Sequence, residues 1–299
     1  YIILVNRKYE HIETVRIDST LSEKLREFRS LLSGTDMSVN ARSKFDAFSR
    51  TGYELYGILI EPVKEYFISD ELLISPDNVL SYLPFETFLS SAYKGTGIVY
   101  RKLPYLMNDF SISYTYSASF MKETVARDYG KTRRLAAFAP LYTTAIDLDS
   151  LTAIRDAGRQ ILYDLPYARI EAEYVSGISN GTLYLNDDAR ESVFKAEAGK
   201  YDIIHLAMHT LLNDQNPMAS AMIFAQGHDQ PEDGFLNTYE VYGIPLKARM
   251  VVLSSCNTGS GILTSGEGIL SLARGFLYSG SQSVVMSMWE IEDRSGTEI

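Results

Sequence analysis

From residue 71 onward, short apolar runs of strand length alternate with segments of helical periodicity. The runs include ELLISP (71–76), RLAAFAP (134–140), YDIIHLAM (201–208) and MVVLSSC (250–256). Because parallel strands need a crossover connection, and the crossover is usually a helix, this alternation predicts a mainly parallel sheet with helices on both faces. Runs that are apolar throughout, such as YDIIHLAM, are typical of interior strands buried on both sides. The sequence therefore predicts an α/β fold.

Further segments continue the same alternation. Strands are expected at 110–116, 182–185, 221–226 and 283–289, and helices near 167–178, 188–198 and 267–279. The first part of the chain has a different pattern: two apolar runs about a polar middle predict a β-hairpin over 1–18, and helices follow at 21–32 and about 38–67. We therefore expect an N-terminal hairpin and helical extension over 1–70 and an α/β domain over 71–299.

Composition narrows the class of protein. The chain has 299 residues, of which 45% are hydrophobic, and a single Cys, so no disulfide is possible within it and a reducing, cytoplasmic location is expected. The sequence contains no run of about 18 apolar residues, so no membrane span is predicted. The net charge of −10, without a basic cluster, argues against direct nucleic-acid binding. Tyr1 lies within an apolar run, and the last residues follow a predicted strand without a terminal signal. We therefore expect the chain to be a piece of a longer protein, truncated at its C-terminal end.

Two reactive side chains come after predicted strands. His209 comes directly after the strand 201–208, and Cys256 closes the strand 250–255. The carboxyl ends of neighbouring parallel strands meet at one edge of a sheet, where reacting groups collect. A thiol beside an imidazole is the arrangement that covalent acyl transfer requires, because the thiolate attacks a carbonyl while the histidine transfers the proton. Their separation of 47 residues is similar to the roughly 50 that separate the caspase histidine from its cysteine.

Other interpretations of these residues remain open. Free cysteine is often simply buried, although the glycine-rich segment NTGSGILTSGEG (257–268) lets the backbone leave the core directly after Cys256. A strand, a glycine loop and a helix can also bind a dinucleotide, with Glu290 as the acidic partner, but Thr264 stands where that fingerprint needs glycine. One Cys and four scattered His offer no metal-ligand spacing, so no metal is expected.

The remaining histidines are expected to have no part in this chemistry. His205 lies within the predicted strand 201–208, where a histidine is typically a core residue whose polar atoms are satisfied. His11 and His228 lie in polar, turn-like surroundings and are expected to be solvated.

Several segments, in the same order along the chain, resemble the CHAT domain. They are YDIIHLAMHT, NPM (216–218), VVLSSCNTGSG and GEGILSLARGFLYSGSQSVVMSMWEIED, preceded by LLISPDNVLSYLPFETFL (72–89) and FSISYTYSAS (110–119), which resemble the family's first two strands. The CHAT domain is a caspase-like peptidase module related to separase and the caspases, and it is often attached to tetratricopeptide repeats. The resemblance covers about 71–293 and implies a caspase-like sheet sandwiched between helices.

The resemblance also implies roles for particular residues. His209 matches the catalytic histidine and Cys256 the nucleophile. The family often has glycine after the histidine, where its backbone N–H helps to form the oxyanion hole; here Thr210 stands at that position and its N–H would act with that of Cys256. In separase-like relatives an acid beyond the next strand receives a basic P1 side chain, which implies Asp293 first and Glu290 second. No cofactor is implied.

The implied function is that of a cysteine endopeptidase that cleaves a protein or peptide substrate. Control by an attached tetratricopeptide-repeat region or a regulatory protein, and a place in bacterial signalling or defence, are implied by the family alone. Two alternatives remain: a catalytically silent CHAT module that serves as a docking or signalling scaffold, and a nucleotide-binding module.

Overall fold

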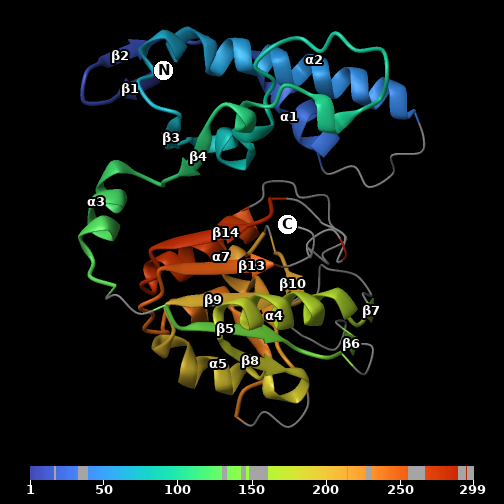
Figure 1. The fold of residues 1–299 in the computed structure, drawn as a ribbon, viewed down its shortest axis with the longest axis vertical. Coiled ribbons are helices and arrows are strands. Elements are labelled where there is room, and N and C mark those ends of the chain that lie inside the picture. Colours follow the sequence, from blue (N-terminus) through green and yellow to red (C-terminus); the bar gives the residue numbers. More distant parts are fainter. Residues whose placement is uncertain are drawn as a thin grey trace. The chain divides into compact units, whose positions relative to one another are not determined.

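The computed structural model divides along the chain into two compact units, Tyr1–Glu123 and Thr124–Ile299 (Figure 1). It describes residues 1–16, 18–32, 40–129, 133–142, 146–147, 161–213, 215–226, 231–254, 267–288 and 294. The division falls between residues 123 and 124, whereas the sequence pattern predicts a domain boundary between 70 and 71. Each unit has its own hydrophobic core.

The first unit begins with the predicted hairpin, formed by β1 (Ile2–Val5) and β2 (Glu10–Glu13). The two strands pair antiparallel, with Ile3 opposite Ile12. Asn6 makes the turn: its backbone N–H donates to the Tyr9 carbonyl at 2.9 Å, and its side-chain oxygen accepts the backbone N–H of Lys8 at 2.9 Å. An asparagine that bonds its own backbone in this way is a common cause of a tight turn.

Two helices supply most of the first core. The helical elements are α1 (Ser19–Leu32), α2 (Ala41–Leu59) and the 3-10 helix η1 (Glu61–Tyr66). In α1 the buried residues Leu21, Leu25 and Phe28 recur at helical spacing, and the Asp18 carboxylate accepts the Leu21 N–H at 2.9 Å as an N-cap. The Phe28 ring stacks on that of Phe48 in α2, with 5.1 Å between ring centroids.

Strands β3 (Glu71–Ile74) and β4 (Ser111–Tyr114) pair parallel to each other, also in the first unit. The sequence pattern predicts both in the same alternation as the later strands, but the structure gives them a ladder of their own, and that prediction was wrong. The physical reason lies in the connection between them. It packs Leu83, Phe88 and Leu103 into the core of α1 and α2 instead of against the larger sheet.

The second unit is built on a five-stranded parallel sheet in the order β14-β13-β9-β5-β8. Its strands are β5 (Leu135–Ala139), β8 (Thr182–Leu185), β9 (Ile203–Ala207), β13 (Met250–Ser254) and β14 (Ser283–Met286). The accompanying helices are α4 (Pro166–Ser179), α5 (Glu191–Glu197), α6 (Thr238–Val241) and α7 (Glu267–Tyr278). Helix α3 (Ala118–Ala126) spans the boundary between the two units. The predicted α/β fold is confirmed.

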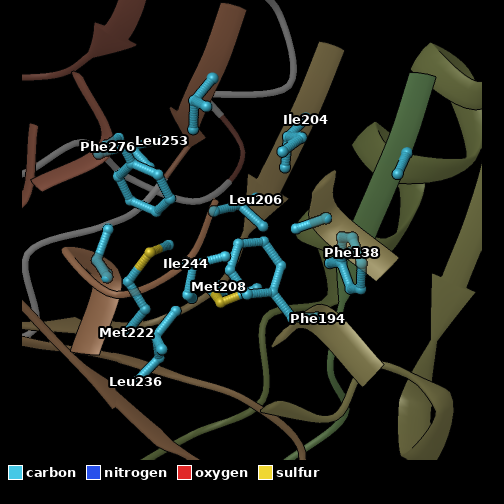
Figure 2. Close-up of a cluster of buried hydrophobic side chains, with 14 of the residues drawn as sticks. Phe138, Phe194, Ile204, Leu206, Met208, Met222, Leu236, Ile244, Leu253 and Phe276 are labelled. Carbon is cyan, nitrogen blue, oxygen red and sulfur yellow. The ribbon is translucent and has the colours of Figure 1, made fainter. Parts of the chain in front are cut away.

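The side chains of successive residues in each strand point to opposite faces of this sheet. In β5, Phe138 packs with Phe194 of α5 and Phe276 of α7, whereas Ala137 packs with Ala172 of α4. Figure 2 shows the Phe194 ring in the middle of the first cluster, with Phe138, Leu206 and Met222 around it. The period of two along a strand thus places helices on both faces. Among the helices in the described ranges, none is long and apolar enough to cross a membrane.

Two smaller sheets complete the second unit. Strands β10 (Thr210–Leu211), β11 (Ala221–Ile223) and β12 (Phe235–Asn237) form an antiparallel sheet, and β6 (Ile146–Asp147) pairs with β7 (Ile161–Leu162). The predicted strand at 221–226 is present, but it lies outside the parallel sheet. The connection from β10 is too short for a helical crossover, so the chain returns antiparallel.

Gly280 and Gly177 offer a matched test of this packing. Gly280 has φ +120°, and an added Cβ would lie 2.2 Å from the Leu246 carbonyl oxygen, whereas a Cβ at Gly177 in α4 meets nothing within 4 Å. Gly280→Ala should lower the free energy of unfolding by about 2–3 kcal/mol. Gly177→Ala should raise the free energy of unfolding by about 0.5–1 kcal/mol, because alanine loses less backbone entropy than glycine when the helix folds. Urea denaturation followed by circular dichroism measures both, and equal midpoints would contradict the assignment.

Candidate active site

His209 lies at the carboxyl edge of the parallel sheet, two residues beyond the end of β9. Strand β13 is the parallel neighbour of β9, as the predicted site requires (Figure 1). Cys256 comes two residues after β13 but lies outside the described residues, as does the whole segment 255–266.

The pairing register relates the two strand ends. Ser254 stands opposite Ala207, and Met250 opposite Ile203, so each residue of β13 pairs with the residue 47 positions earlier. His209 and Cys256 are also 47 positions apart, since 256 − 209 = 47. The sequence separation of the two candidate residues therefore equals the register offset of the strands that precede them.

The His209 ring is fixed by a backbone carbonyl. Its Nε2 lies 2.6 Å from the carbonyl oxygen of Tyr163, in the segment between β7 and α4. Because a carbonyl oxygen only accepts hydrogen bonds, Nε2 carries the hydrogen and donates it. In the neutral ring the lone pair is then on Nδ1. The contact defines both the orientation and the tautomer of a nearly buried imidazole, which is 4% exposed.

The backbone of His209 is joined to β11 through Tyr142. The His209 N–H donates to the Tyr142 hydroxyl at 3.1 Å, and this hydroxyl donates to the Ile223 carbonyl at 2.7 Å. The Ile223 N–H in turn donates to the His209 carbonyl at 2.9 Å. Tyr142 thus occupies the place of a direct bond between the His209 N–H and the Ile223 carbonyl.

The surroundings of Tyr142 keep this hydroxyl neutral. Burial raises the pKa of Tyr142 far above its ordinary value, although the hydrogen bond from His209 acts in the opposite direction. The hydroxyl therefore retains the proton that it donates to Ile223. The Tyr142 and His209 rings also contact each other, with 4.7 Å between their centroids.

Thr210 begins β10, directly after His209, and pairs with Met222 of β11. Hydrogen-bonded and non-hydrogen-bonded pairs alternate along an antiparallel ladder. The Ile223 N–H donates to the His209 carbonyl, so these two residues form a hydrogen-bonded pair. The adjacent Thr210–Met222 pair is therefore a non-hydrogen-bonded pair. The Thr210 N–H therefore faces the side of β10 opposite β11.

Asp293, Glu290 and Glu292 lie outside the described residues, and so does Trp289. Strand β14, which precedes them, ends at Met286 and pairs parallel with β13, Met286 opposite Leu253. The chain after β14 therefore leaves the sheet at the same edge as the chain after β9 and β13.

Two residues of the site were missed by sequence reasoning. Tyr142 lies 67 positions before His209, and nothing in its local pattern distinguishes it from the other 20 tyrosines. Tyr163 contributes its backbone carbonyl, which every residue type has, while its side chain is 73% exposed. Only the contact between segments distant in sequence identifies either residue.

The other histidines have partners of their own. His205 is a buried core residue with its polar atoms satisfied, as predicted. Its Nε2 lies 2.7 Å from a carboxylate oxygen of Glu171 in α4. His11 was expected to be solvated, but it lies in β2 with its ring stacked on Tyr66 at 4.1 Å, so that expectation was wrong. Its place in a strand over an aromatic ring, not in a turn, explains the difference. His228 lies outside the described residues.

One acidic cluster of the described residues has the geometry of a cation site. Carboxylate oxygens of Glu191, Glu232 and Glu240 lie within 4.8 Å of one another. The Lys195 ammonium already contacts all three, at 2.7, 2.5 and 2.8 Å. Burial raises the pKa of Glu191 to about 7 despite the opposing effect of Lys195. The lysine thus supplies the positive charge at the centre, and the cluster ties α5 to the first turn of α6.

Tyr142→Phe tests the hydroxyl that joins His209 to β11. The variant keeps the ring but leaves the His209 N–H and the Ile223 carbonyl buried without this bridge, so the free energy of unfolding should fall by about 1–3 kcal/mol. Tyr163→Phe is the control, because its exposed ring changes while its carbonyl remains. Denaturation curves, with the His209 ring resonances followed by NMR, make the comparison. Equal stability of the two variants would contradict the role of the bridge.

The sequence was also compared with known proteins. No curated protein matches it. The family model described as CHAT domain matches residues 49–299, which is most of the chain and includes both strands of the candidate site. The chain therefore belongs to the CHAT domain family, which is related to the caspase-like peptidases.

Proposed function

We propose that the chain is a cysteine endopeptidase in which His209 and Cys256 form the catalytic pair. The observation that carries the proposal is the register of β9 and β13: their paired ends, Ala207 and Ser254, are each followed two residues later by the histidine and the cysteine. Neighbouring parallel strands deliver the residues after them to one edge of a sheet. Membership of a family related to the caspase-like peptidases supports the same conclusion.

The tautomer of His209 suits the proposed chemistry. With Nε2–H donated to the Tyr163 carbonyl, Nδ1 is the nitrogen that can take the thiol proton. The carbonyl also stabilises the imidazolium that forms, because it accepts a hydrogen bond from the charged ring. A fixed ring orientation lowers the cost of reaching the reactive geometry.

The reaction is proposed to proceed through an acyl-enzyme. Cys256 transfers its proton to His209, and the thiolate attacks the scissile carbonyl carbon. The backbone N–H groups of Thr210 and Cys256 stabilise the oxyanion; for Thr210, an N–H that faces away from β11 supports this role. The imidazolium then protonates the leaving amine as the C–N bond breaks. Water, deprotonated by His209, hydrolyses the thioester and regenerates the thiol.

Thiol labelling tests the pair directly, because Cys256 is the one cysteine of the chain and every label reports on it alone. His209→Ala should slow alkylation of the folded protein by iodoacetamide at pH 7 by at least about tenfold. Both His209→Ala and Cys256→Ala should lower peptide cleavage by at least about 10².

His11→Gln is the matched control, since this histidine lies in the other unit against Tyr66. Urea-unfolded protein gives the labelling rate of an ordinary thiol. If the folded protein and its His209→Ala variant label at the same rate and no peptide is cleaved, the silent-scaffold alternative replaces the peptidase. Cleavage retained by both alanine variants would refute the assignment of the residues.

For substrate selection we propose that Asp293, or else Glu290, receives a basic P1 side chain. Two considerations support this: the resemblance to separase-like peptidases, and the parallel pairing of β14 with β13, which directs the following chain to the site edge. A library of fluorogenic peptides that differ only at P1 should show at least a tenfold preference for Arg or Lys over norleucine. Asp293→Asn should abolish the preference while Glu292→Gln leaves it intact. Indifference of the native chain to P1 charge would contradict the proposal.

We also propose that an attached tetratricopeptide-repeat region or a regulatory protein controls the activity, in the cytoplasm. The frequent attachment of CHAT domains to such repeats supports control by a repeat region. The single cysteine of the sequence, which allows no disulfide within it, supports the cytoplasmic location.

A further inference from the structure

In the first unit, the outer edges of two strands line one cavity. Strand β1 has β2 on one side, and β3 has β4 on one side; Figure 1 shows the four in the order β2, β1, β3, β4. Between β1 and β3 lies a cavity of about 450 Å³, lined by residues 1–6 and by residues 71–77. Among the described residues, those of β2 and β4 take no part in the lining. The cavity is thus a slot with a strand edge along each wall, and we refer to it as the β1–β3 slot.

The hydrogen bonds of the hairpin show which groups of β1 face the slot. The Asn6 N–H donates to Tyr9 across the hairpin. Bonded pairs alternate along an antiparallel ladder, so the backbone groups of Leu4 bond to β2 while those of Ile3 and Val5 point the other way. One wall of the slot therefore presents the N–H and C=O groups of Ile3 and Val5.

The opposite wall is defined by the bonds between β3 and β4. The Ser111 N–H donates to the Asp70 carbonyl at 2.7 Å, and the Thr115 N–H donates to the Ile74 carbonyl at 2.9 Å. Even-numbered residues of this segment thus bond to β4. The backbone groups of Glu71, Leu73 and Ser75 face the slot; the Glu71 N–H already donates to the Ser69 hydroxyl at 3.0 Å, so the donors of this wall are the N–H groups of Leu73 and Ser75. Both walls offer what an added strand needs, which is a row of donors and acceptors at strand spacing.

Side chains on both faces of the slot are apolar. On the inner side the lining includes Leu59, Ile60, Val63, Phe67 and Phe85, which belong to α2, η1 and the first core. On the outer side, Ile3 is 68% exposed, Val5 69% and Leu73 51%. A strand in the slot would place alternate side chains over each of these surfaces, so both sets of its side chains are expected to be apolar.

The charged side chains of the lining are both acidic. Glu71 stands at the start of β3 and Asp77 lies just beyond its end, and both are exposed. They are six positions apart in an extended segment, which corresponds to roughly 20 Å. A bound strand with a basic residue near each end would match them.

We propose that the β1–β3 slot binds an extended segment of a partner protein, apolar in its middle and with Lys or Arg at each end. The segment adds as a strand between β1 and β3 and completes a five-stranded sheet in the order β2, β1, partner, β3, β4. Main-chain hydrogen bonds to both walls supply affinity, and the apolar faces and the two acids supply specificity. Binding at the slot is independent of the proposed peptidase activity.

The probe is the fluorescein-labelled, amidated peptide Lys-Val-Ile-Thr-Val-Ile-Lys, titrated with the full chain and followed by fluorescence anisotropy. It should bind saturably. Hydrogen exchange in the complex should slow at the slot-facing amides of Ile3, Val5 and Leu73, while the amides of Leu4 and Leu72, which face the neighbouring strands, change little. A peptide with Glu in place of both Lys should bind at least about tenfold more weakly.

Variants separate main-chain pairing from charge. Leu73→Pro removes a slot-facing N–H without removing a bond to β4, and it should weaken binding at least about fivefold relative to the matched Leu73→Thr variant, which keeps the N–H. Glu71→Lys with Asp77→Lys should weaken binding about tenfold and improve binding of the Glu-flanked peptide. Glu10→Lys, on β2 and outside the lining, should have no effect.

Three results would overturn the proposal. The first is absence of saturable binding by the Lys-flanked peptide. The second is binding that survives N-methylation of alternate peptide residues on both edges, since such a peptide cannot pair as a strand. The third is protection of the Ile3, Val5 and Leu73 amides in the peptide-free chain together with a dimer in solution, which would make a second copy of the chain the occupant.

Discussion

The parallel pairing of β9 with β13 is the constraint on which the candidate site depends. Each residue of β13 pairs with the residue 47 positions before it, and this offset is maintained over five consecutive pairs at the centre of the sheet. A slip by one residue would exchange the faces of the strand and expose Leu253, which is buried. Burial of the face that carries Val251 and Leu253 therefore fixes the register, and the register determines where the chain after each strand begins. The placement of the candidate residues at the sheet edge is a consequence of how the strands pack in the middle of the sheet.

Much of this arrangement could be predicted from the sequence. Continuous apolar runs identified β9 and β13, and their alternation with helical segments identified the parallel sheet. The same pattern misplaced β3 and β4, whose runs look alike but whose connection packs into a different core. The hydrophobic periodicity of a segment indicates that it forms a buried strand, but it does not indicate which sheet the strand joins.

The contacts that orient His209 could not be predicted, for a different reason. Tyr142 acts through its hydroxyl, which lies between two backbone segments, and Tyr163 acts through its backbone carbonyl. Neither contact produces a recognisable pattern in the sequence around the residue. The contact through Tyr142 also joins two sheets, because His209 comes after a strand of the parallel sheet and is bonded to β11 of the antiparallel one. A displacement of the small sheet would therefore move the backbone of the histidine. This coupling provides a physical route by which events at β10–β12 can reach the site.

The cluster around Lys195 gives two neighbouring carboxyls opposite responses to acid. Burial raises the pKa of Glu191 from 4.5 to about 7, whereas for Glu240 the upward effect of burial is outweighed by hydrogen bonds from Lys195 and Asn237, and its pKa is lowered. Between pH 4.5 and about 7, Glu191 holds more of its proton in the folded chain than in the unfolded one, so its contribution to stability declines as the pH rises through this window. Glu240 contributes stability above its ordinary pKa and loses it only in stronger acid. Folding of the second unit near pH 6 is consequently accompanied by proton uptake at Glu191, and unfolding there returns that proton to the solvent.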